Sequence, residues 1–145
     1  MLIHPLVVHF PVALWIVSLL FDVLAWYRQD PLYRRAAYWL VGLGLLGAAV
    51  SVGSGWLDLL GYERGGVELG IVRRHWMHSI LAYASTVVYL LNFLWRWRRE
   101  NRVTSVLLGL SILGAILIAV AGYLGGALRS AGVHPKVLLT ARSLE

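Results

Sequence analysis

The chain has 145 residues, of which 59% are hydrophobic and 14% are charged, and its formal net charge is +6. Soluble domains are nearer half apolar and a quarter charged, so this composition favours a membrane protein. The chain has no cysteine, which excludes disulfides, thiolate metal sites, iron–sulfur clusters and c-type haem attachment.

Four apolar runs are long enough to cross a bilayer, which takes about 20 residues. They are Leu6–Tyr27, Ala36–Leu60, His75–Trp97 and Val103–Leu128. The short links between them make neighbouring runs antiparallel. The sequence therefore predicts an all-α membrane protein, an up-down-up-down bundle of four transmembrane helices forming one domain over residues 1–143. The final Leu144-Glu145 resembles a remnant of an expression vector.

Arginines gather in the short segments between the runs, as in membrane proteins and unlike a nucleic-acid-binding face. The first and third links with their helix ends hold seven: Arg28, Arg34, Arg35, Arg96, Arg98, Arg99 and Arg102. The other side holds six basic residues over longer segments. The positive-inside rule then places both termini and every histidine outside the cytoplasm. Aromatic residues such as Trp15, Trp26 and Trp97 are expected at the membrane interfaces.

The first run begins with His4 and His9 and contains two prolines. Pro5 is expected at the first helical position, and Pro11 is expected to kink or start the helix beside His9. Asp22 lies in the opposite half of this run. A carboxylate there is costly, so we expect it to pair with Arg28, Arg34 or Arg35.

The second and fourth runs are rich in glycine. The second holds Gly42, Gly44, Gly47, Gly53 and Gly55, and the fourth holds Gly109, Gly114, Gly122, Gly125 and Gly126. Such glycines serve close helix packing in lipid, or they leave clearance for a flat ligand. Trp56 and Asp58 end the second run, where the carboxylate could orient an imidazole or pair with an arginine.

The third run begins with His75 and His78, which share one helix face. Arg73 and Arg74 precede them and could pair with haem propionates or with lipid phosphates. His78 is the deeper histidine and the better candidate for an axial ligand, whereas His75 could bind a propionate. His134, after the fourth run, is expected to be exposed.

The four runs carry a weak tandem repeat. Gly55-Trp56-Leu57 matches Gly122-Tyr123-Leu124, and His9 and His78 precede these segments by similar distances. Two helix pairs of similar design could then face each other around a twofold axis along the membrane normal.

The first and third runs are expected to lie diagonally in the bundle, so their histidines would face each other. We therefore predict one haem b near the outer leaflet, with His9 and His78 as axial ligands and His4, His75, Arg73, Arg74, Trp56, Gly55 and Gly122 around it. An alternative is a copper, zinc or iron ion held by some of His4, His9, Asp58, His75 and His78. A second alternative is a non-catalytic assembly subunit of a respiratory complex.

The opening His4-Pro5-Leu6-Val7-Val8-His9-Phe10-Pro11 resembles the signature of a bacterial membrane family, domain of unknown function 2231. The resemblance extends to Trp56, Asp58, Arg74, His75, His78 and Gly122-Tyr123-Leu124-Gly125-Gly126. It implies a four-helix protein of the bacterial cytoplasmic membrane. Because the domain occurs beside Rieske-type or c-type cytochrome modules, the resemblance also implies a redox role. Some relatives carry histidine where this chain has Ala127, which argues against a ligand on the fourth run.

The predicted activity is electron transfer, either by the protein alone or as an oxidoreductase subunit. The expected partners are the lipid bilayer, quinol, a periplasmic cytochrome or Rieske-type protein, and a second copy of the chain, with no nucleic acid. No histidine lies in the cytoplasmic half, so a second haem is not expected there.

Overall fold

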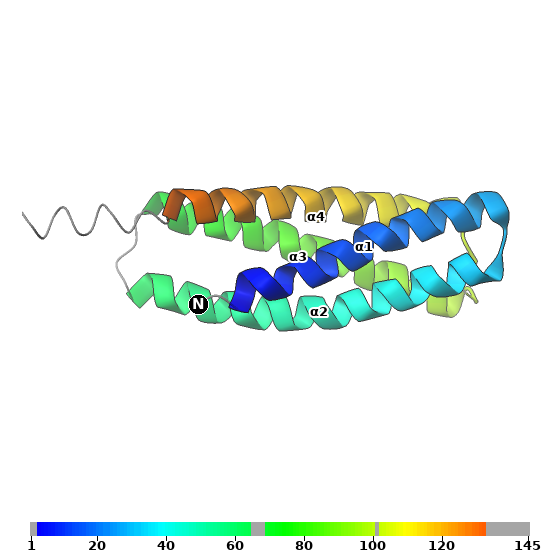
Figure 1. Cartoon of the computed structure of the whole chain (residues 1–145), viewed down its shortest axis with the longest axis horizontal. Helices are drawn as coiled ribbons and strands as arrows, with labels where there is room; N and C mark the ends of the chain where they lie inside the picture. The colour runs from blue at the N-terminus through cyan, green and yellow to red at the C-terminus, as the bar shows by residue number, and fades with distance from the viewer. Residues whose placement is uncertain (1–2, 65–68, 101, 133–145) are drawn as a thin grey trace, which may run out of the picture.

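The computed structural model of the chain describes residues 3–64, 69–100 and 102–132, with side chains described over 7–56, 76–100 and 102–126. These residues form four helices and no strand: α1 (Ile3–Arg28), α2 (Pro31–Arg64), α3 (Leu69–Arg98) and α4 (Ser105–Gly132) (Figure 1). All four are long and apolar enough to cross a membrane. The predicted four-helix membrane fold is confirmed.

The first and second links between helices are shorter than predicted, the third is slightly longer, and polar residues cap the helices that follow the first and third links. Only Gln29 and Asp30 separate α1 from α2, because Asp30 Oδ1 accepts a hydrogen bond from Leu32 N at 2.8 Å and Pro31 begins the helix. At the third link, the Thr104 hydroxyl accepts a hydrogen bond from Leu107 N at 3.2 Å, so α4 begins at Ser105. The second link was predicted as Gly61–Arg74, but α2 continues to Arg64 and α3 begins at Leu69.

Proline does not interrupt α1. The helix runs from Ile3 through Pro11 to Arg28, so Pro11 does not start it, and Pro5 is the third helical residue rather than the first. The Pro11 ring packs close to the glycine face of α2 at Gly47. That contact lies on the α1–α2 interface, which is more extensive than the interfaces between the hairpins.

The helices pack as two hairpins, α1–α2 and α3–α4, which are joined by smaller α1–α4 and α2–α3 interfaces. Helices α1 and α3 are therefore diagonal, as predicted, and so are α2 and α4. We call the end where α1 and α3 begin the histidine end. The end where they finish is the arginine end, which carries Arg28, Arg34, Arg35, Arg98 and Arg99.

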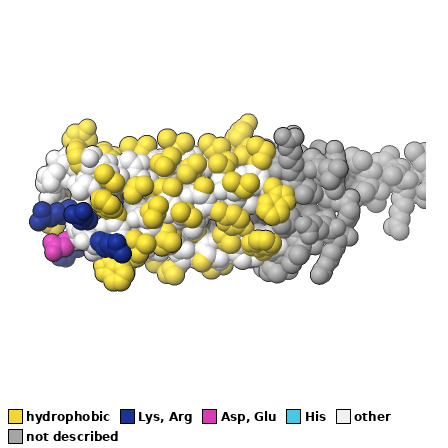
Figure 2. All heavy atoms as spheres, turned by 180° about the vertical axis from the view of Figure 1, so that it is seen from behind, with side chains coloured by type: hydrophobic (Ala, Val, Ile, Leu, Met, Phe, Trp, Pro, Cys, Tyr) yellow, Lys and Arg dark blue, Asp and Glu magenta, His cyan; other side chains and the backbone are white. Residues whose placement is uncertain are grey.

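The outer surface of the bundle is apolar over its length. Figure 2 shows hydrophobic side chains covering the described part of this face, with the described Lys and Arg side chains gathered at one end of it. Leu20, Trp39, Leu46 and Ile116 are all more than half exposed. A band of exposed apolar side chains of this extent requires a lipid environment, so the protein is a multi-pass membrane protein.

Two aromatic rings stack at the centre of the bundle. Trp15 of α1 and Tyr89 of α3 are fully buried, with ring centroids 4.2 Å apart and planes inclined by 15°. Each ring fits against a glycine of its own hairpin, Trp15 against Gly44 and Tyr89 against Gly114. The prediction that Trp15 lies at the membrane interface was wrong, because these glycines make room for both rings in the core.

A buried ion pair joins the hairpins nearer the arginine end. Both oxygens of Asp22 accept hydrogen bonds from Arg96 Nη2, at 2.7 and 2.6 Å, and both side chains are fully buried (0% exposed). Ser111 Oγ donates to Asp22 Oδ2 at 2.7 Å, while Asn92 accepts from Arg96 Nε at 2.7 Å and donates to Ser111 Oγ at 2.8 Å. We call these four residues the polar cluster.

The expectation of an arginine partner for Asp22 was right, and the partner that the structure shows, Arg96, was not among the arginines predicted. Arg28 and Arg35 are exposed at the end of the bundle, whereas Asp22 faces α3 across the core. Arg96 was counted among the arginines that set the orientation, but its charge is neutralised inside the bundle. The orientation of the termini stays a prediction.

Replacing Gly114 by alanine should destabilise the protein, because the new Cβ would lie 2.6 Å from the Tyr89 ring. We expect a loss of about 1–3 kcal/mol, as for other overpacked cores. The matched control is Gly109→Ala on the same helix, where no atom lies within 4 Å of the added Cβ. Unfolding in a denaturing detergent measures both, and equal stabilities would contradict this packing.

Breaking the ion pair on one side should cost more than removing it altogether. Asp22→Leu or Arg96→Met each leaves a buried charge unpaired, at a cost of about 3–5 kcal/mol. The double variant leaves no charge and should be more stable than either single variant. Arg98→Met, at an exposed arginine, is the control for loss of charge. Additive effects in a double-mutant cycle of detergent unfolding would show that the two side chains do not interact.

Candidate functional site

A cavity of about 420 Å³ lies between the two hairpins towards the histidine end. The hairpins are separated there, on the left of Figure 1. All four helices line the cavity, and the buried Trp15 lies at its inner limit. The volume falls in the range of ordinary ligand sites, roughly 300–1,000 Å³.

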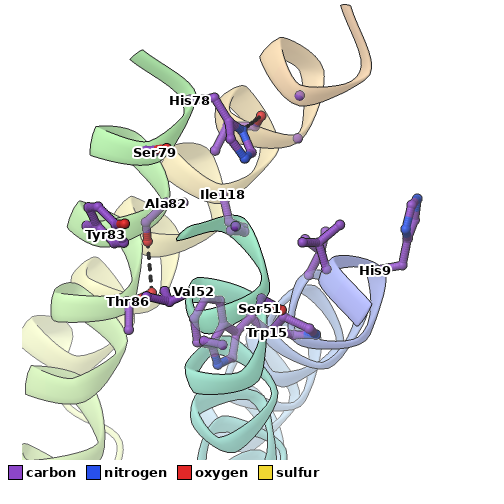
Figure 3. Close-up of a pocket in the computed structure, with 18 of the residues that line it drawn as sticks. His9, Trp15, Ser51, Val52, His78, Ser79, Ala82, Tyr83, Thr86 and Ile118 are labelled. Atoms are coloured by element: carbon purple, nitrogen blue, oxygen red, sulfur yellow. Dashed lines mark hydrogen bonds between the residues drawn. The ribbon is translucent and has the colours of Figure 1, made fainter. Parts of the chain in front are cut away.

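The walls of the cavity are mainly apolar and small. From α1 and α2 they contain Val8, His9, Pro11, Val12, Trp15, Ala48, Ser51, Val52, Gly55 and Trp56. From α3 and α4 they contain Trp76, His78, Ser79, Ala82, Tyr83, Thr86, Ile118, Ala121, Gly122, Gly125 and Gly126. Two of the hydroxyl groups donate to carbonyls of their own helices, Ser51 to Gly47 and Thr86 to Ala82, each at 2.8 Å, and Figure 3 shows the second of these bonds. These two hydroxyl groups are therefore already bonded within their own helices.

His78 is oriented by a hydrogen bond to the neighbouring helix. Its Nδ1 lies 2.7 Å from the carbonyl oxygen of Ala121 on α4. A carbonyl oxygen only accepts, so Nδ1 is the donor of this hydrogen bond. Metal-binding histidines are commonly held by such a bond from the other ring nitrogen.

Glycine on α4 makes this position of His78 accessible. A Cβ at Gly125 would lie 3.0 Å from Cε1 and 3.1 Å from Nδ1 of His78, closer than most real contacts. Gly122 and Gly126 also line the cavity, but no atom lies within 4 Å of where their Cβ would be. The glycines of α4 therefore serve two purposes: Gly125 admits the histidine ring, and Gly122 and Gly126 leave open space.

His9 lies at the margin of the cavity. Its side chain is exposed, and Figure 3 shows it on α1 at the opposite side of the pocket from His78. The two histidines predicted as axial ligands thus line one cavity from diagonal helices.

The structure brings five of the predicted site residues to the same cavity: His9, Gly55, Trp56, His78 and Gly122. The backbones of His4, Asp58, Arg73, Arg74 and His75 lie in α1, α2 and α3, and their side chains lie outside the described part. His134 lies outside the described residues. Among the described side chains, no three His, Cys, Asp or Glu residues lie together as a metal site.

Sequence analysis missed the α3 wall of the cavity and the acceptor for His78. Ser79, Ala82, Tyr83 and Thr86 recur three and four residues apart directly after His78, so this helix face could have been identified from the sequence. The Ala121 carbonyl had no such signal, because it depends on how closely α3 and α4 approach.

The repeat predicted in the sequence has a different register in the structure. Trp15 meets Tyr89, and Asp22 meets Arg96, each pair 74 residues apart. The repeat predicted from the sequence matched His9 to His78 and Gly55 to Gly122, and this alignment differs from the 74-residue spacing of the contacts between α1 and α3.

Comparison with known proteins supports the membrane assignment. No curated protein and no solved structure matches the chain significantly. The model of a family described as predicted membrane protein, DUF2231, matches residues 2–135. That match covers all four helices, and so this chain belongs to the DUF2231 family of membrane proteins.

Proposed function

We propose that the protein is a small b-type cytochrome that holds one haem b in the cavity between its hairpins. The observation that carries the proposal is the His78 ring, which is fixed by Ala121 beside an apolar cavity with open glycine faces. Nε2 of His78 would be the iron ligand, since Nδ1 donates to the carbonyl.

The walls of the cavity fit a flat, mainly apolar plate. Gly122 and Gly126 leave space that a side chain would fill, and the other walls contain the small side chains of Ala48, Ala82 and Ala121. Trp56 and Trp76 line the cavity and are partly exposed. Arg73 and Arg74 lie near the start of α3 at the same end, where guanidinium groups would suit haem propionates.

Bound haem supplies one-electron oxidation and reduction. The chain would confine that chemistry to the histidine end, because the Trp15–Tyr89 stack and the polar cluster fill the core beyond the cavity. We propose the bacterial cytoplasmic membrane as its location, with the histidine end facing outward. Quinol and a periplasmic cytochrome or Rieske-type protein are the proposed electron-transfer partners.

The two alternatives gain less support. A copper, zinc or iron site would need the undescribed side chains of His4, Asp58 or His75, since the described ones form no cluster of metal ligands. An assembly subunit without a cofactor would need no cavity of this size, because buried polar residues alone would be enough to join its helices.

Protein purified from haem-supplemented cells should show a Soret band and a reduced α-band. His78→Ala should remove the pigment or change its ligation, while the protein remains extractable and folded. Absorption spectra with haem quantification measure this. A colourless wild-type protein would contradict the proposal, and elemental analysis would then separate the metal-ion alternative from the assembly subunit.

Filling the cavity should block haem without disturbing the fold. Gly122→Leu places a side chain where no protein atom lies within 4 Å, and an overlap with haem costing about 1–3 kcal/mol would lower haem affinity about 5- to 150-fold. Gly53→Leu is the matched control, because that position is equally open and does not line the cavity. Equal haem titrations of the two variants would place haem elsewhere.

A further inference from the structure

The contacts between the hairpins define a common register for their helices. Trp15 stacks on Tyr89, and Asp22 pairs with Arg96, so each α3 position corresponds to the α1 position 74 residues earlier. In the second helix of each hairpin, Gly44 receives the Trp15 ring and Gly114 receives the Tyr89 ring. Gly44 of α2 therefore corresponds to Gly114 of α4, and this pair sets the register of the second helices.

On α2 and α4, the second helix of each hairpin, the residues that line the cavity follow this register. The α2 residues that line it begin at Ala48 and end at Trp56, and those of α4 begin at Ile118 and end at Gly126. Counted from Gly44 and from Gly114, the lining residues of the two helices fall at identical intervals. The repeat thus extends from the core into the cavity walls.

The same register holds on the first helix of each hairpin. Val8, His9 and Val12 of α1 correspond to Ala82, Tyr83 and Thr86 of α3, and all of these residues line the cavity. His9 is therefore the counterpart of Tyr83 and not of His78.

The counterpart of His78 is His4. The interval along the chain from His78 to Tyr89 is the same as that from His4 to Trp15. The His78 ring packs on Gly125, and the interval from Gly114 to Gly125 is the same as that from Gly44 to Gly55. Each hairpin thus carries the same elements at the same spacings: a histidine, an aromatic residue and a pair of glycines.

We propose that His4, and not His9, is the imidazole that holds the haem opposite His78. The inference rests on the proposed function and names the second axial ligand. Position 4 lies within α1, and the 74-residue spacing that relates Trp15 to Tyr89 and Asp22 to Arg96 makes it the counterpart of position 78. His9 then forms part of the cavity wall, as Tyr83 does on the other side.

The test compares three histidine variants of the full chain in detergent, each loaded with haem. Wild-type protein should show the electron paramagnetic resonance and absorption of low-spin iron with two imidazole ligands. His4→Ala should become high-spin, with added imidazole restoring the low-spin signal, whereas His9→Ala should remain low-spin. His4→Met keeps a ligand at this position and should raise the reduction potential, as methionine ligation does.

The outcomes separate this inference from the proposed function. Haem that becomes high-spin in His9→Ala and stays low-spin in His4→Ala would overturn the role of His4 and leave the cytochrome intact. A wild-type protein that binds no haem would overturn both.

A measurement without haem checks the geometry when a variant does not fold. The chain has no cysteine, so the pairs His4→Cys/His78→Cys and His9→Cys/His78→Cys can be compared with a short bis-maleimide. We expect the first pair to be cross-linked faster within one chain. Faster cross-linking of the second pair would overturn the proposed register.

Discussion

The ion pair between Asp22 and Arg96 is the contact on which the relative position of the two hairpins depends. Between helices in a membrane the hydrophobic effect gives little attraction, because lipid tails are as apolar as leucine. Close packing and polar contacts must hold the bundle together. Each hairpin has extensive contacts within itself, whereas the interfaces between hairpins are small. The polar cluster adds an ion pair and hydrogen bonds to these small interfaces, and it joins α1, α3 and α4.

This concentration of contacts at one end explains why a cavity exists at the other. The stack of Trp15 on Tyr89 ends the tightly packed region, and the hairpins lie apart beyond it. Small residues on α2 and α4 widen the space instead of closing it, since a bulky residue at Gly122 or Gly126 would project into the open volume. Glycine therefore lets aromatic rings pack closely in one half of the molecule and leaves open space in the other. Fold and candidate site follow from one arrangement of glycines.

Much of the fold could be predicted from the sequence because it depends on local properties. The four apolar runs, the short links and the diagonal relation of α1 and α3 follow from length and hydrophobicity alone. His78 and Gly122 could be assigned to one site for the same reason, as both lie near the same end of their helices. The partner of Asp22 could not be found in this way, because Arg96 lies 74 residues away and the nearer arginines matched the expectation equally well.

The register of the repeat also could not be found by matching short sequence motifs. The short motif around Gly55 resembles the segment at Gly122, yet the ring contacts at Gly44 and Gly114 align Gly55 with Gly125 instead. This match, with two identical residues of three, carried less information than the equal spacing of Trp15 to Asp22 and of Tyr89 to Arg96. That spacing is visible in the sequence, but only the stacked rings and the ion pair show that it matters.

The pairing of opposite charges at this depth also bears on the response of the protein to a transmembrane voltage. A lone elementary charge carried across the whole membrane gains or loses about 2.3 kcal/mol per 100 mV. Asp22 and Arg96 lie side by side with no net charge between them, so the electric field exerts almost no net force on the pair. A change in the transmembrane voltage is therefore not expected to displace the hairpins relative to each other at this ion pair.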